Sequence, residues 1–215
     1  MINKFPVQQP ISSVAKPTVK SVPINPQLIS EMKNLTSSVK RQLGNGEQLI
    51  QDLNKFLATS AAKGATSDSL PAALSANVQK FMVNCQETQM VTRDLLQNHG
   101  FSVKPSLTDD GRILLDHPQL GSLRTTPLAD LLKNSAVINK SASVNDFLKA
   151  LAPKSTDFAA NDQVASLGSH KHHLPSIPSI LEGVLFIMSR LVMISDLANS
   201  VLAATKQATA KLGNL

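Results

Sequence analysis

The segment from Pro178 to Lys211 constrains the fold more than any other part of the chain. Its apolar residues recur at helical spacing and cover well over half of a helical circumference. We therefore predict one long helix that is buried at the centre of a helical bundle. Two alternatives stay open, an oligomerisation helix and a helix on a membrane surface. In these alternatives the predicted partner-binding residues are Leu185, Met188 and Val192.

Charged residues exclude a membrane span in this segment. Glu182, Arg190 and Asp196 interrupt every window that is long enough to cross a bilayer. The composition also favours helices, because aromatic residues make up 3% of the chain and neither Trp nor Tyr occurs. Strands are normally enriched in aromatic residues. The single Cys85 excludes an intramolecular disulfide and a thiolate zinc site.

The first 26 residues form a proline-dense leader. Prolines at this density prevent a helix or a central strand, so we expect residues 1–26 to be disordered. No acidic residue precedes Glu31, and the leader has no apolar stretch of the kind found in a Sec signal peptide. It is either a plain tail or an uncleaved export signal. Its prolines and lysines are Pro6, Pro10, Pro17, Pro23, Pro26, Lys4, Lys16 and Lys20.

Residues 27–152 are predicted to be a helical region. Two short amphipathic helices are expected between Leu28 and Gly64, separated by a break at residues 44–46, which read Gly-Asn-Gly. A longer helix should run from an N-cap at Ser69 to Gly100. Its expected buried residues are Leu74, Val78, Phe81, Met82, Cys85, Thr88, Thr92, Leu95 and Leu96.

A β-hairpin is predicted at residues 101–116, because an Asp110-Gly111 pair lies between two apolar runs. Two more helices are expected. One starts at Thr126 and Pro127 and extends to about Val137. The other starts at Ser143. Residues 153–177 are predicted to be a linker before the long helix of residues 178–215. The fold class is therefore mainly α, a bundle of five or six helices with a small β-hairpin and a disordered leader.

The charge and the histidines give few functional candidates. The net charge of +6 is scattered along the chain, which argues against a nucleic-acid-binding patch and leaves contact with a membrane surface open. His170, His172 and His173 are candidate metal ligands, but they lack a fourth ligand and a rigid frame, so simple solvation is favoured. We predict no cofactor and no small-molecule substrate.

One short run offers a candidate catalytic residue. Residues 121–126 read Gly-Ser-Leu-Arg-Thr-Thr, and this run resembles the arginine-finger loop of bacterial GTPase-activating toxins. The resemblance implies that Arg124 stabilises the charge of the transition state on the nucleotide of a bound GTPase. The later Gln-Trp-Gly segment of that family is absent. The alternative is a surface arginine that precedes a helix.

The leader without acidic residues, the scarcity of Cys and aromatic residues and the many Ser, Thr, Asn and Gln residues resemble proteins exported by bacterial type III secretion systems. This resemblance implies a secreted, non-enzymatic virulence effector or translocation component that binds proteins. The partner would be a host protein, an export chaperone or a second copy of the chain. A structural subunit of a filament or oligomer, a GTPase-activating effector and a cytoplasmic location are the alternatives.

Overall fold

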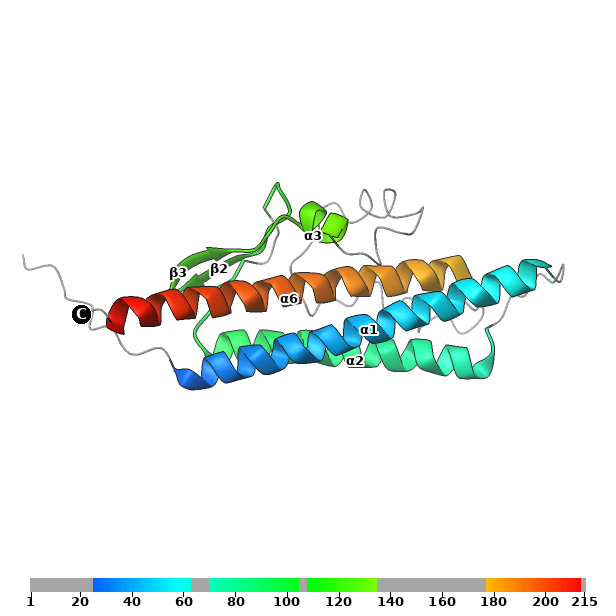
Figure 1. Cartoon of the computed structure of the whole chain (residues 1–215), viewed down its shortest axis with the longest axis horizontal. Coiled ribbons are helices and arrows are strands. Elements are labelled where there is room, and N and C mark those ends of the chain that lie inside the picture. Colours follow the sequence, from blue (N-terminus) through cyan, green and yellow to red (C-terminus); the bar gives the residue numbers. More distant parts are fainter. Residues whose placement is uncertain (1–24, 63–69, 105–107, 135–176, 214–215) are drawn as a thin grey trace, which may run out of the picture.

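The structure is a computed structural model that describes residues 25–62, 70–104, 108–134 and 177–213 (Figure 1). These residues form four helices and three strands, so the chain is mainly α as predicted. The elements are α1 (Pro26–Ala62), α2 (Ala72–Asn98), β1 (Ser102–Val103), β2 (Leu114–His117), β3 (Gly121–Arg124), α3 (Leu128–Asn134) and α6 (Ile177–Gly213).

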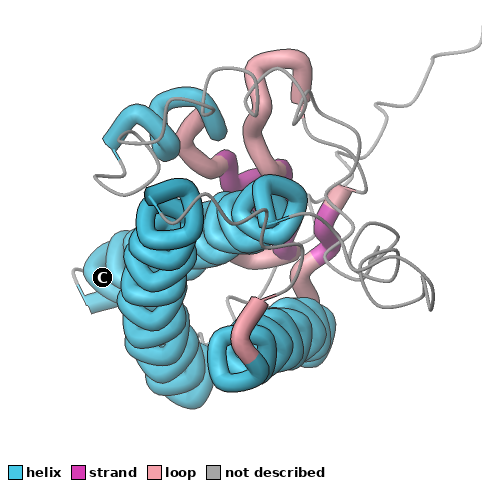
Figure 2. The backbone as a smooth tube through the Cα atoms, turned by 90° about the vertical axis from the view of Figure 1, so that its right-hand side faces the viewer, coloured by secondary structure: helices cyan, strands magenta, loops and turns pink. Residues whose placement is uncertain are grey.

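The three long helices form the body of the molecule. α1 runs antiparallel to both α2 and α6, as the course of the colours in Figure 1 shows. α6 contacts α1, α2, α3 and β3, so it is the central element of the described chain. Figure 2, an end-on view, shows the strands grouped to one side of the long helices.

α6 confirms the prediction of a long C-terminal helix. Its apolar stripe is buried against the other elements, which is the first of the three interpretations that its sequence allowed. The carboxylate of Asp196, at the edge of this stripe, accepts hydrogen bonds from Thr126 before α3. The buried side chains of α6 include Val184, Leu185, Ile187, Met188, Leu191, Met193, Ile194, Leu197, Ala198 and Val201.

α1 is one continuous helix, so the predicted break at residues 44–46 is wrong. Gly46 is buried where three helices meet, and a Cβ atom there would lie 2.8 Å from Met188 Sδ and 2.9 Å from Phe81 Cζ. Its missing side chain therefore allows a close approach of α6 and α2. A glycine inside a helix costs about 0.5–1 kcal/mol relative to alanine, and tertiary packing commonly outweighs such a cost.

α2 confirms the predicted long helix and most of its buried stripe. Cys85, Thr88, Thr92 and Leu96 are among its buried residues. The helix starts after Pro71, which occupies the N-cap position without a side-chain hydrogen bond. The predicted cap, Ser69, lies outside the described residues.

The predicted hairpin is present, and the structure adds a third strand to it. β1 pairs antiparallel with β2, and the connection contains a tight turn in which Gly111 N donates to Thr108 O at 2.8 Å. β3 pairs with the other edge of β2, so the sheet order is β1-β2-β3. The sequence predicted no strand at residues 121–124. They form one because pairing with β2 supplies hydrogen bonds that four residues cannot make alone.

Hydrogen bonds of His117 connect the turn between β2 and β3 to the end of α2. Its Nδ1 accepts the N–H groups of Gln119 and Leu120, each at 3.1 Å. The proton must therefore lie on Nε2, which donates to the carbonyl oxygen of His99 at 3.0 Å. Gly121 completes the turn with a φ of +73°, a conformation that glycine adopts without strain.

The structure describes fewer helices than the five or six predicted, for two reasons. The two helices expected between residues 28 and 64 are one helix, and the helix expected from Ser143 lies outside the described residues. α3 confirms a helix after Pro127. Val137, the leader before residue 25 and most of the predicted linker are likewise outside the described residues.

Candidate functional site

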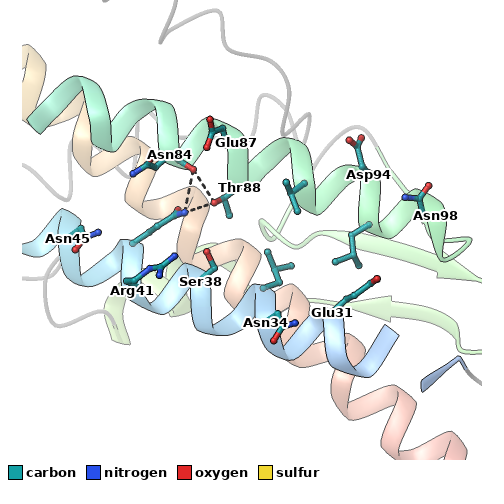
Figure 3. Close-up of a pocket in the computed structure, with 14 residues that line it drawn as sticks. Glu31, Asn34, Ser38, Arg41, Asn45, Asn84, Glu87, Thr88, Asp94 and Asn98 are labelled. Atoms are coloured by element: carbon teal, nitrogen blue, oxygen red, sulfur yellow. Dashed lines mark hydrogen bonds between the residues drawn. The ribbon is translucent and has the colours of Figure 1, made fainter. Parts of the chain in front are cut away.

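A groove of about 740 Å³ runs between α1 and α2 (Figure 3). Polar side chains form most of its lining, and three apolar side chains interrupt them. The lining residues are Glu31, Asn34, Leu35, Ser38, Arg41, Gln42, Asn45, Asn84, Glu87, Thr88, Val91, Asp94, Leu95 and Asn98.

Helical periodicity places these side chains in two facing rows. On α1 they recur at intervals of three and four residues from Glu31 to Asn45, beside the buried stripe. On α2 they recur in the same way from Asn84 to Asn98. Because α1 and α2 are antiparallel neighbours, the two rows become the walls of one groove.

A buried amide lies where the two walls meet. Gln42 is 8% exposed, and its Nε2 donates to Thr88 Oγ1 at 2.5 Å and to the carbonyl oxygen of Asn84 at 3.4 Å. Thr88 Oγ1 itself donates to the same carbonyl at 3.0 Å, so it can only accept from Gln42. This arrangement fixes which end of the amide is nitrogen. The other end, Gln42 Oε1, is buried without a hydrogen-bond partner.

The two halves of the groove differ in charge. Figure 3 shows Glu31 and Asp94 towards one end and Arg41 towards the other, with Glu87 on the α2 wall. His99 Nε2 lies 2.6 Å from Glu31 Oε2 at the acidic end. The hydrogen bond from His99 is the main reason that the pKa of Glu31 is lowered, and a hydrogen bond from Gln27 adds to the effect.

The acidic half also carries the apolar side chains. Leu35 is buried, Leu95 is half-buried and Val91 is exposed at the rim. Carboxylates, amides and hydroxyls next to apolar carbon can bind a ligand that offers both hydrogen-bond donors and apolar surface. The groove therefore offers hydrogen-bonding groups beside apolar carbon.

Cys85 lies on the buried side of α2. It is fully buried, and desolvation raises the pKa of its thiol to about 12. At neutral pH the thiol is protonated, as expected for a cysteine that serves as a small apolar core residue.

Arg124 lies at the end of β3, opposite Leu114 of β2, and its side chain is exposed. It precedes α3 and is held in a strand ladder. The run that resembles an arginine-finger loop therefore begins with a β-strand.

The predicted partner-binding residues of the C-terminal helix lie in the interior. Leu185 and Met188 are buried in the core, and Val192 is partly buried against it. In this arrangement Leu185 and Met188 contact the chain's own helices and are not available to a partner. The candidate metal ligands His170, His172 and His173 lie outside the described residues.

Sequence reasoning missed the groove. The groove was not predicted, because nothing local in the sequence shows that the polar faces of two amphipathic helices adjoin. One signal was present: Thr88 and Thr92 occupy positions of the buried stripe of α2. A polar residue at a core position needs a hydrogen-bond partner, and for Thr88 that network includes Gln42 of α1.

Within the described ranges, no group of three or more His, Cys, Asp or Glu side chains is placed to hold a metal ion. None of the described helices has both the length and the apolar character that crossing a bilayer requires. No protein-family model, curated protein or solved structure matches the chain.

Proposed function

We propose that this chain is a secreted, non-enzymatic protein that acts by binding another protein through α2 and the groove beside it. The observation that carries the proposal is the position of exposed apolar side chains. Val83 is 52% exposed, Met90 45% and Val91 56%, and all three belong to α2.

The spacing of Val83 and Met90 places them on one face of α2. Val83 and Met90 are seven residues apart, so they lie on the same outward face of α2. Val91 lies about 100° further round the helix, by the 3.6-residue turn, and lines the groove, so Val83 and Met90 flank the groove and Val91 is on its rim. Single exposed apolar residues are normal on protein surfaces. A group on one helix beside a polar groove is more typical of an interaction site.

Secretion is the part of the proposal that rests on the sequence alone. The leader of residues 1–26 has lysines and no acidic residue, and the whole chain has one Cys and few aromatic residues. This composition resembles that of type III secreted proteins. Deleting residues 1–26 should abolish export from a bacterium with an active type III system, and continued export would refute this part.

Site-specific crosslinking tests the binding part. A photo-crosslinking amino acid in place of Met90 should form a covalent product with a second protein in the secreting cell or its host. The matched control is the same amino acid at Gln119, which is exposed in the turn between β2 and β3. Equal products at both positions, or none at Met90, would contradict the proposal.

The structure gives less support to a filament subunit built on the C-terminal helix. That alternative was motivated by the apolar face of α6, and this face is occupied by contacts with α1, α2, α3 and β3. The exposed apolar residues of α2 are better placed for a partner.

A further inference from the structure

The uneven charge and the dimensions of the groove indicate what kind of segment binds there. We propose that the α1–α2 groove accepts an amphipathic helix of a partner protein, with a basic side chain at the Glu31–Asp94 end. This inference rests on the proposed function and specifies the partner for the same surface.

The charge distribution is the first argument. The lining residues include three carboxylates, of Glu31, Glu87 and Asp94, and one guanidinium, of Arg41, on a chain whose net charge is +6. Asp94 has a contact of 3.4 Å with Arg93, but the Asp94 side chain is 56% exposed, so an incoming cation can still pair with it. Complementary charge orients a partner and selects against acidic segments.

The dimensions of the groove favour a helix as the occupant. From Glu31 to Asn45 the wall formed by α1 is about 21 Å long at 1.5 Å per residue, which matches a helix of about 14 residues. A third helix can pack its side chains between two neighbouring helices. Apolar residues at intervals of three and four on such a helix would contact Leu35, Val91 and Leu95, which is the helix-in-groove mode of recognition.

Peptide selection tests the proposal without knowledge of the natural partner. Random 16-residue peptides displayed on phage are selected on the full chain and, in parallel, on Asp94→Lys. Asp109→Lys is the matched control, because Asp109 is also an exposed acidic residue but lies in the hairpin turn. The wild type and the control should select peptides with a Lys or Arg near one end and apolar residues at intervals of three and four.

The selected peptides are then measured by fluorescence anisotropy. We expect Asp94→Lys to weaken binding at least tenfold, and a peptide with its basic residue changed to Glu to recover much of that loss. Thermal unfolding of each variant verifies that it is folded, and the effect of Asp94→Lys, at an exposed position, does not depend on core packing.

Several results would overturn the inference. These are peptides without a basic bias, affinity unchanged by Asp94→Lys, or self-association of the chain that Asp94→Lys abolishes. Tighter peptide binding after deletion of residues 1–26 would assign the groove to the chain's own lysine-containing leader instead. If crosslinking at Met90 succeeds while Asp94→Lys has no effect, the proposed function stands and this inference fails.

Discussion

Gly46 of α1 lies so close to Met188 of α6 that a Cβ atom added to the glycine would be 2.8 Å from the methionine sulfur. Phe81 of α2 lies on the other side of the same position, at 2.9 Å. The absence of one side chain therefore brings three helices together at a single point of the core.

Gly46→Ala should destabilise the protein, and Gly44→Ala should not. The methyl group at position 46 requires Met188 or Phe81 to move, and overpacking of a core costs about 1–3 kcal/mol. Nothing lies within 4 Å of the corresponding atom at Gly44. Alanine there should add about 0.4–1 kcal/mol, because it restricts the unfolded chain. Urea unfolding of the two variants measures both effects, and equal effects would contradict this role for Gly46.

Asp196 is expected to stabilise the junction between α3 and α6. Its carboxylate accepts the N–H of Thr126 at 2.7 Å and the hydroxyl of Thr126 at 3.1 Å. Asp196→Ala should lower the free energy of unfolding by about 1–3 kcal/mol, since hydrogen bonds to charged groups are stronger than neutral ones. Asp130→Ala is the control, because Asp130 has an exposed contact of 3.8 Å with Lys133. An equal loss of unfolding free energy in both variants would show that the Thr126 hydrogen bonds stabilise the protein no more than the exposed Asp130–Lys133 contact does.

The Cys85 thiol should react with disulfide reagents only when the protein opens. It is fully buried and its pKa is raised to about 12, so the nucleophilic thiolate is scarce at neutral pH. The modification rate should therefore rise with urea concentration in parallel with unfolding. Asn77→Cys in a Cys85→Ala background provides an exposed thiol on the same helix and should react at once. Fast modification of native Cys85 would contradict the buried position.

The contact between Glu31 and His99 should make stability depend on acid pH. The pKa of Glu31 is lowered from 4.5 in the folded protein, mainly by its hydrogen bond with His99. The stabilisation is therefore fully present above the unfolded pKa of Glu31 and is lost as the pH falls through its folded pKa. Glu31→Gln should remove this part of the decrease in the free energy of unfolding as the pH falls from neutral through 4.5 and below.

Denaturant unfolding at several pH values measures this effect. Glu47→Gln is the matched control, because Glu47 is on the same helix and away from His99. A pH profile of Glu31→Gln that is identical to that of the wild type would show that the contact does not stabilise the fold.

The helices were predictable to the extent that their apolar residues repeat locally. The spacing of Leu28, Met32, Leu35 and Val39 predicts the buried face of α1, and all four are buried. The Asp110-Gly111 pair predicts the hairpin turn. Spacing alone did not predict β3, because Gly121–Arg124 is too short to show a pattern and is a strand only beside β2.

The sequence by itself determined which segments are helical and which of their faces are apolar, because both properties follow from the periodicity of neighbouring residues. Tertiary structure alone decided three other features. Packing of Met188 and Phe81 around Gly46 keeps α1 continuous, pairing with β2 creates β3, and the adjacency of α1 and α2 turns two polar faces into a groove. Each depends on groups far apart in the chain, and their energies outweigh the local preferences that a sequence pattern reports.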